Sequence, residues 1–306
     1  PPQQQYRGLL KKAGVTVNEE VMRVILKHFA SSVALIETSD QAQDLYYEAA
    51  MLPRSATQLA LRERNISVAE VFRGSDPSKA VLLHAHEDGA PRILKIGTSD
   101  SVLREMEVWN AVSARHHGNE KDTHLVPLKY LQFEDATVVQ VGDISGGSSV
   151  PIPRVRSGIL MTHYQGTLAQ CKVPLQDHVL LRYGHYLYNA ISALHKAGYC
   201  HLDVKPSNIF LFEHECFLGD YGAAVKTGEP IRERTLKYYP KDGDFEAKEE
   251  TDMYLLAVTL LEMHGAIPTV SERATSLTKA EIHAAIEAIA SDTVRKFLLS
   301  LLTDTK

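Results

Sequence analysis

The hydrophobic pattern changes its period along this chain, and that change decides which folds are open to it. Between residues 66 and 162, apolar and β-branched residues form short runs typical of strands, and one helical segment at 100–114 interrupts them. After Gly166 the apolar residues recur at helical spacing. The sequence therefore predicts an α+β fold, with a β-rich small lobe followed by a larger helical lobe.

These runs also predict where the elements lie. The expected strands span residues 68–72, 80–84, 92–96, 125–131, 137–141 and 159–162. The glycine- and proline-bearing stretch 142–153 is interpreted as a loop insertion between two strands. One apolar stripe predicts a helix that ends at Gly198, and the run 253–263, apolar nearly all round, predicts a helix buried on every side.

Residues 1–65 are expected to form a helical extension. Thr16-x-x-Glu19 and Thr38-x-x-Gln41 have the pattern of capping boxes, in which two side chains satisfy the free N–H groups at a helix start. We expect this extension to contact the small lobe within the same chain and brace it, rather than to form a separate binding module.

Composition excludes several partners. The 306 residues carry a formal net charge of −5, which leaves no basic surplus for gripping phosphate backbones, so nucleic acid is not an expected partner. The most apolar stretch, 253–261, is about half as long as a bilayer-spanning helix, so no membrane contact is expected. Three cysteines at unpatterned spacing indicate a reducing, intracellular compartment, either cytoplasmic or nuclear.

The densest group of chemically active residues is His201-Leu-Asp203-Val-Lys205-Pro-Ser-Asn208, followed by Asp220-Tyr221-Gly222. The intervening proline and serine favour a tight loop, in which a carboxylate, an amine and an amide can converge. Phosphoryl transfer needs such a group, because it requires a proton acceptor, a cation for the moving charge and oxygen ligands for Mg²⁺.

This segment resembles the catalytic loop and the metal-binding motif of eukaryotic-type protein kinases. The resemblance extends over about residues 66–306 and implies a two-lobed protein-kinase fold that uses ATP and Mg²⁺ on a protein substrate. It makes Asp203 the catalytic base, Lys205 the transition-state cation, and Asn208 and Asp220 the Mg²⁺ ligands. The lysine two residues after the aspartate resembles serine/threonine kinases more than tyrosine kinases.

The resemblance also implies a nucleotide clamp in the small lobe. Lys95 matches the lysine that holds the α- and β-phosphates. We expect Glu105 to be the ion-pair partner of Lys95, because Trp109 lies one turn later on the same helix face. Glu107 is the alternative.

Further matches concern the hinge and the support of the catalytic loop. Met161 resembles the gatekeeper, and Thr162, His163 and Tyr164 belong to the hinge whose backbone would meet adenine. Asp252 matches the aspartate that supports the catalytic loop from beneath. His201 is expected to pack against the metal-binding motif rather than to act as a base.

The chain departs from the family pattern at three places. Of the glycine-rich loop that covers the phosphates only Gly74 survives. Leu202 stands where many kinases carry an arginine that docks a loop phosphate, so activation by phosphorylation at Thr235 is not expected. Lys241 stands roughly where the family has a glutamate in the substrate-side loop.

The sequence therefore predicts an ATP- and Mg²⁺-dependent serine/threonine protein kinase, with a helical extension at 1–65, an N-lobe at 66–162 and a C-lobe at 163–306 that is cut short. A pseudokinase that acts as a nucleotide-binding scaffold or allosteric partner is the first alternative. A small-molecule phosphotransferase is the second, although that class seldom carries a lysine at the position of Lys205.

The altered phosphate loop leads to a first prediction. Asp76 places a negative charge near the triphosphate, and Pro77 removes a backbone donor, so nucleotide affinity is expected to be weak. Replacing the carboxylate in Asp76→Gly should tighten MgATP binding, measured by calorimetry. An unchanged dissociation constant would contradict this interpretation.

Overall fold

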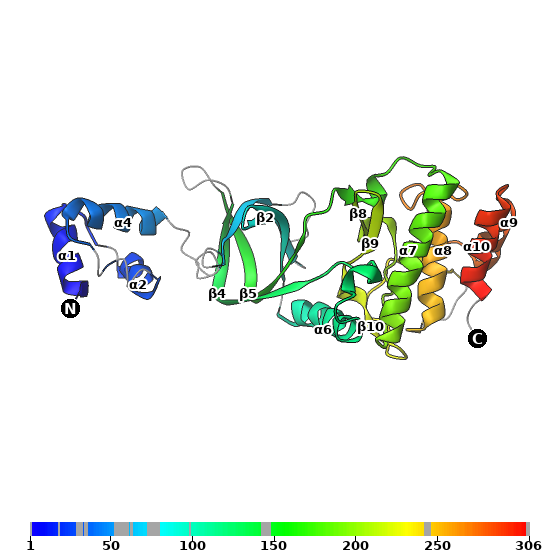
Figure 1. Ribbon diagram of the computed structural model, residues 1–306, viewed down its shortest axis with the longest axis horizontal. Coiled ribbons are helices and arrows are strands. Elements are labelled where there is room, and N and C mark those ends of the chain that lie inside the picture. Colours follow the sequence, from blue (N-terminus) through cyan, green and yellow to red (C-terminus); the bar gives the residue numbers. More distant parts are fainter. Residues whose placement is uncertain are drawn as a thin grey trace. The chain divides into compact units, whose positions relative to one another are not determined.

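A computed structural model describes residues 2–17, 19–28, 33, 36–51, 61, 64–71, 80–97, 99–141, 148–241 and 246–303 of the chain (Figure 1). The chain divides into two compact units. The first comprises Pro1–Ser99 and Tyr130–Leu160, and the second comprises Asp100–Lys129 and Met161–Lys306. The domain boundaries expected after residues 65 and 162 stay predictions.

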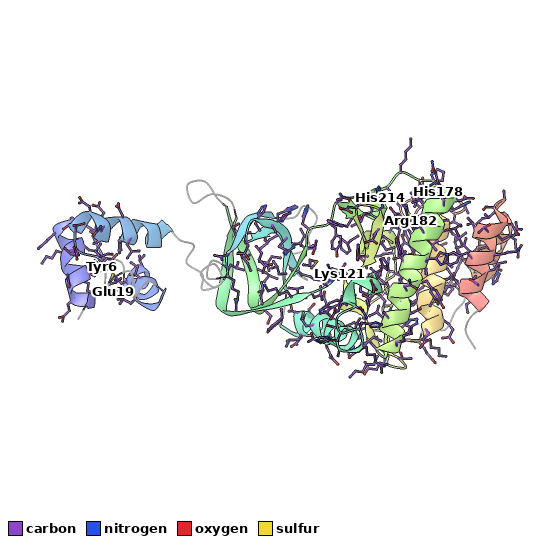
Figure 2. All side chains as sticks on the ribbon, viewed as in Figure 1. Tyr6, Glu19, Lys121, His178, Arg182 and His214 are labelled. Atoms are coloured by element: carbon purple, nitrogen blue, oxygen red, sulfur yellow. The ribbon has the colours of Figure 1, made fainter. Side chains whose placement is uncertain are left out.

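The N-terminal helices share a hydrophobic core of their own. They are α1 (Pro2–Lys12), α2 (Glu19–His28) and α4 (Ser39–Met51). Tyr6, labelled in Figure 2, lies in this core, and its hydroxyl donates to the Ala42 carbonyl at 3.0 Å. The capping box at Thr38 is confirmed, because the Gln41 N–H donates to Thr38 Oγ1 at 3.2 Å and Gln41 Oε1 accepts from the Thr38 N–H at 3.2 Å.

The first unit also holds most of a five-stranded sheet in the order β1-β2-β3-β5-β4. Its strands are β1 (Ile66–Val71), β2 (Ala80–Glu87), β3 (Ala90–Gly97), β4 (Lys129–Val141) and β5 (Ser148–Thr162). Strands β2 and β3 pair antiparallel around Asp88-Gly89, which both have positive φ, as a two-residue hairpin turn requires.

Two expectations about this sheet are wrong. Residues 148–153, assigned to the loop insertion 142–153 because they contain two prolines and follow three glycines, begin strand β5. Residues 125–128, assigned to a strand, precede β4 and make only an isolated bridge from Leu125 to Leu218. Local composition is a weak guide in both cases, since strand pairing is decided by partners distant in sequence.

The second unit is mainly helical. Its helices are α6 (Ser99–Arg115), α7 (Asp177–Lys196), α8 (Glu249–His264), α9 (Lys279–Glu287) and α10 (Asp292–Thr303). Its short helical turns are η1 (Glu120–Thr123), η2 (Leu168–Gln170), η3 (Pro206–Asn208), η4 (Tyr221–Ala223) and η5 (Leu236–Tyr238). Its short strands are β6 (Gly166–Thr167), β7 (Tyr199–Cys200), β8 (Ile209–Phe212), β9 (Glu215–Leu218) and β10 (Val225–Lys226).

Helix α8 forms the centre of this unit. It is buried from Asp252 to Met263, as its nearly uniform apolar sequence predicts. Helices α7 and α10 pack against it, as Figure 1 shows. Gly184 on α7 permits the close approach, because a Cβ atom there would overlap the Phe297 ring of α10 and lie 3.3 Å from Cδ1 of Leu260.

This contact gives a stability prediction. Gly184→Ala should lower the free energy of unfolding by about 1–3 kcal/mol, because the added methyl overpacks the α7–α10 contact. Urea denaturation of the purified chain measures the change.

The matched test is a double-mutant cycle with Phe297→Leu, which removes the ring atoms nearest to the new methyl. Gly184→Ala should cost less in that background than in the wild type. Equal costs in the two backgrounds would show that the Phe297 ring is not the obstacle.

Candidate active site

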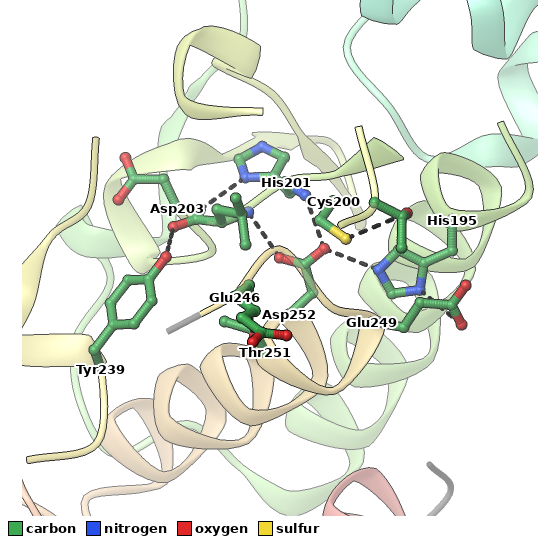
Figure 3. A network of polar contacts seen from close by, with 11 residues as sticks. His195, Cys200, His201, Asp203, Tyr239, Glu246, Glu249, Thr251 and Asp252 are labelled. Carbon is green, nitrogen blue, oxygen red and sulfur yellow. Dashed lines mark hydrogen bonds and ion pairs between the residues drawn. The ribbon is translucent and has the colours of Figure 1, made fainter. Parts of the chain in front are cut away.

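The catalytic loop is held by a buried carboxylate beneath it. Asp252, in the first turn of α8, is fully buried and accepts the His201 N–H and the Leu202 N–H, each at 2.7 Å (Figure 3). His195 at the end of α7 donates its Nε2 proton to the same carboxylate at 2.9 Å. Asp252 therefore supports the loop, as expected from the resemblance, and also connects it to α7 through His195.

Leu202 shows how firmly this loop is bound. Its φ is +64°, which is unusual for a residue with a branched side chain. Its N–H donates to Asp252, and its carbonyl accepts the Tyr239 hydroxyl at 2.6 Å. Its side chain is buried in an apolar cluster with Cys200, Val225 and Ala247. These contacts maintain a backbone conformation that would otherwise be unfavourable.

His201 links the loop to the Asp-Tyr-Gly motif. Its Nδ1 accepts the Asp203 N–H at 3.3 Å, so Nε2 carries the proton and donates to the Gly219 carbonyl at 3.1 Å. The ring is fully buried and lies edge-on to Tyr221. These contacts suit the packing role that we expected for His201.

Asp203 is the centre of the polar contacts. Its Oδ2 is 2.7 Å from Lys205 Nζ and accepts from Asn208 Nδ2 at 2.9 Å. Its Oδ1 accepts the Thr235 hydroxyl at 2.7 Å, and Thr235 Oγ1 in turn accepts from Lys205 Nζ at 2.8 Å. The predicted residues Asp203, Lys205 and Asn208 thus meet, with Thr235 closing the group.

The two proposed Mg²⁺ ligands flank one hairpin, since Asn208 directly precedes β8 and Asp220 follows β9. Strands β8 and β9 pair from Ile209 with Leu218 to Phe212 with Glu215, and the Gly219 N–H donates to the Asn208 carbonyl at 3.0 Å. Asn208 uses Nδ2 for Asp203, so its amide oxygen is the atom suited to a hard cation. Asp220 has φ +63° and ψ +73°, a left-handed conformation. An amide oxygen and a carboxylate so connected form a donor set that fits Mg²⁺.

Tyr221 packs as the buried aromatic of the motif and also makes a polar contact. Its hydroxyl donates to the Val126 carbonyl at 2.8 Å and lies 3.3 Å from the Leu218 carbonyl. Burial raises the pKa of this hydroxyl well above its usual value, so it stays a donor. The bond fixes the motif to the segment that precedes β4.

The surroundings of the two candidate glutamates on α6 differ. Glu105 is 1% exposed, and its Oε1 and Asp220 Oδ1 both lie within 4 Å of the point where a Gly222 Cβ would stand. Glu107 has a side chain 57% exposed, accepts the Tyr199 hydroxyl at 2.8 Å and lies 3.3 Å from Lys226 Nζ. These bonds, led by that from Tyr199, lower the pKa of Glu107. Glu105 is therefore the glutamate beside the motif.

The other residues predicted to bind the nucleotide are divided between the two units. Lys95 is a half-buried residue of β3 in the first unit, whereas Glu105 belongs to the second, and their pairing stays a prediction. Met161 and Thr162 end β5, and His163 follows them. The Tyr164 ring packs against Phe210, Phe212 and Phe217. Gly74 lies outside the described residues.

Sequence reasoning did not find two of the contacts at this site. The hydrogen bond from the Thr235 hydroxyl to Asp203 is not predictable, because no spacing rule connects residues 32 positions apart. The Tyr239 hydroxyl bond to Leu202 was missed for the same reason. A clue to Thr235 existed, since it is a small hydroxyl residue within the family-like loop.

His195, Cys200 and Asp252 also form a group with metal-binding atoms within 4.8 Å of one another. The Asp252 oxygens already accept hydrogen bonds from two backbone N–H groups and from His195. Burial raises the pKa of the Cys200 thiol to about 12, which disfavours the thiolate that a metal needs. This group is a structural support, and Cys171, Cys200 and Cys216 are all free thiols.

The sequence is similar to known protein kinases. A family model, described as the protein kinase domain, matches residues 152–304, half of the chain. A Wee1-like protein kinase of Arabidopsis thaliana is 34% identical over 98 residues, which is 30% of this chain and 20% of that protein. The serine/threonine-protein kinase ArnS of Sulfolobus acidocaldarius is 30% identical over 199 residues, 54% of this chain and 30% of that protein. The chain thus spans less than a third of either relative.

The fold is similar to that of solved kinases. The Cydia pomonella granulovirus kinase PK-1 superposes with a TM-score of 0.57 at 15% identity, covering 80% of this chain and 90% of its own. Vaccinia related kinase 3 gives a TM-score of 0.54 at 14% identity, covering 78% and 81%. Within the described helices, none combines the length and apolarity needed to cross a membrane.

These similarities confirm the α+β kinase fold class predicted from the sequence. The family match also covers the catalytic loop, the Asp-Tyr-Gly motif and helix α8. The chain belongs to the protein kinase superfamily.

Proposed function

We propose that this kinase domain is catalytically active and transfers the γ-phosphoryl group of ATP to serine or threonine hydroxyls of a protein substrate. The observation that carries this proposal is the contact of Asp203, Lys205 and Thr235 at 2.7–2.8 Å. A proton acceptor, a cation and a loop hydroxyl so arranged need no large reorganisation before the reaction.

Each residue then has a stated role. The Asp203 carboxylate orients the substrate hydroxyl and accepts its proton, and the Lys205 ammonium stabilises the charge that spreads over the transferred phosphoryl group. Asn208 and Asp220 would hold Mg²⁺, which would neutralise part of the charge of the ATP phosphates. Lys95, paired with Glu105, would hold the α- and β-phosphates, and residues 161–164 would contact adenine.

Preference for serine and threonine is supported by two observations. Lys205 lies two residues after Asp203, which is the serine/threonine arrangement. The similar proteins ArnS and mos of Xenopus laevis are both named serine/threonine-protein kinases. A serine/threonine peptide library and a tyrosine peptide library, offered separately with labelled ATP, distinguish the two specificities.

A pseudokinase is the second candidate, because the phosphate loop retains only Gly74 and carries Asp76 and Pro77. Such a protein would bind a partner and transfer no phosphate. The compact group around Asp203 favours catalysis over this alternative, since a scaffold has no need of a lysine and a hydroxyl on the same carboxylate.

Substitution of the proposed base tests the function. Asp203→Asn keeps the size of the side chain but removes the proton acceptor, so the rate of phosphate transfer should fall by about a hundredfold or more. Transfer from radiolabelled ATP to protein and to a metabolite mixture is measured in parallel. Activity with metabolites alone would favour a small-molecule phosphotransferase.

The matched control is Asp292→Asn, an exposed aspartate on α10, which should leave the rate unchanged. Thermal unfolding shows that both variants are folded. Wild-type protein that transfers no phosphate to protein at saturating MgATP would refute the proposed activity and favour the pseudokinase.

Tyr221 gives a prediction about the metal. In Tyr221→Phe the buried Val126 carbonyl loses its donor, which should lower the free energy of unfolding by about 1–3 kcal/mol. Because Tyr221 follows Asp220, the Mg²⁺ concentration for half-maximal activity should rise, by roughly fivefold for each 1 kcal/mol lost from the metal-holding conformation.

Activity titrated with Mg²⁺ at saturating ATP measures this effect. The control is Tyr130→Phe on β4, which removes a hydroxyl bonded to Ser157 and should not change the Mg²⁺ dependence. Coincident Mg²⁺ curves for wild type and Tyr221→Phe would show that the hydroxyl does not position Asp220.

A further inference from the structure

A buried ion pair lies near the substrate-side loop. Glu262, in the last turn of α8, is 3.1 Å from Arg273 Nη2, and the two side chains are only 6% and 3% exposed. Burying two charges is costly, and such a pair often adds nothing to stability compared with apolar residues of similar size. Its occurrence at this position therefore calls for a functional explanation.

The cost is increased because Arg273 is incompletely satisfied. Among the residues that the structure describes, Nε and Nη1 of Arg273 are buried and have no hydrogen-bond partner. If Arg273 served stability alone, all of its N–H groups would be expected to donate hydrogen bonds, because a buried donor without an acceptor is unfavourable.

Tyr238 is the third member of this group. The Arg273 guanidinium carbon lies 5.4 Å from the centre of the Tyr238 ring, a cation–π contact. Tyr238 is buried, and burial first, followed by the charge of the Glu262 carboxylate, raises the pKa of its hydroxyl. The guanidinium of the ion pair therefore contacts the Tyr238 ring.

That ring belongs to the turn that holds Thr235. Tyr238 ends η5, and its N–H donates to the Thr235 carbonyl at 3.0 Å. The two residues between Thr235 and Tyr238 are hydrogen-bonded to the loop that follows α8 and carries Arg273. Lys237 Nζ donates to the Val270 carbonyl at 3.1 Å, and the Ser276 hydroxyl donates to the Leu236 carbonyl at 2.8 Å.

We propose that Glu262 and Arg273 are positioning residues that anchor the turn 235–238, and through it hold Thr235 against Asp203 and Lys205 where a protein substrate binds. The pair gives this loop a carboxylate–guanidinium anchor although Lys241 stands where the family has a glutamate. The inference rests on the proposed function and extends it to the substrate side of the site.

The test replaces the pair without emptying the space it fills. In the double variant Glu262→Gln with Arg273→Met, both charges are removed together, so no uncompensated charge is left buried. The unfolding temperature should stay within about 4 °C of the wild type. The KM for dephosphorylated casein should rise roughly fivefold or more, while the KM for ATP stays within about twofold.

Two further variants sharpen the result. Tyr238→Phe keeps the ring beside the guanidinium and removes only the hydroxyl, so its KM for casein should rise less than that of the double variant. Asp292→Asn with Arg295→Met makes the same chemical changes in an exposed ion pair of α10 and should leave all constants unchanged.

Hydrogen exchange of the backbone amides in residues 235–241 measures how firmly this segment is held, and the measurement does not depend on catalysis. These amides should exchange about tenfold faster in the double variant than in the wild type. Unchanged exchange overturns the inference, and so does an active wild type whose KM for casein is unaffected or whose KM for ATP rises equally. An inactive wild type overturns the proposed function instead, and the exchange rates then decide whether the anchor exists.

Discussion

The arrangement of this site depends on the buried carboxylate of Asp252. Residues 201–205 lie in neither helix nor strand, so no backbone ladder fixes their geometry. Asp252 replaces that ladder by accepting two successive backbone N–H groups from a side chain on the rigid helix α8. A loop held in this way can carry a residue at φ +64°, because the two bonds and the Tyr239 hydroxyl oppose its relaxation.

From this support the polar contacts extend in two directions. Toward the metal-binding motif, the His201 ring bonds to Gly219, and the Asn208 side chain bonds to Asp203. Toward the substrate-side loop, Asp203 and Lys205 both contact the Thr235 hydroxyl. Asp203 thus has fixed partners on both sides, and a group oriented before the reaction is the main requirement for electrostatic catalysis.

The parts predictable from sequence were those with local rules. The buried helix α8 and the capping box at Thr38 follow from periodicity and spacing over a few residues. The start of β5 was not predictable, because its two prolines and the glycines just before it suggest a loop, and only pairing within the sheet makes it a strand.

The sequence could distinguish between two candidate site residues only where their burial could be inferred. Spacing left both Glu105 and Glu107 open, since both lie on the same helix. The structure distinguishes them, because one is buried beside Gly222 and the other is exposed against Tyr199 and Lys226. One half of the Glu262–Arg273 pair was indicated by the sequence. Glu262 is a single glutamate at the end of the apolar run of α8, and a buried glutamate needs a partner of opposite charge.

The residue at position 202 changes how the substrate-side loop can be controlled. An arginine there could receive a phosphate, but the Leu202 side chain is fully buried among apolar residues and has no charge to offer. The loop is held instead by the Tyr239 hydroxyl, by Thr235 and by the Tyr238 ring on Arg273. None of these contacts needs an added phosphate. Phosphorylation of Thr235 would instead replace the hydroxyl hydrogen that is donated to Asp203. It would also place a negatively charged phosphate beside the Asp203 carboxylate, and the two groups would repel each other. We therefore expect the unmodified loop to be the one compatible with phosphate transfer.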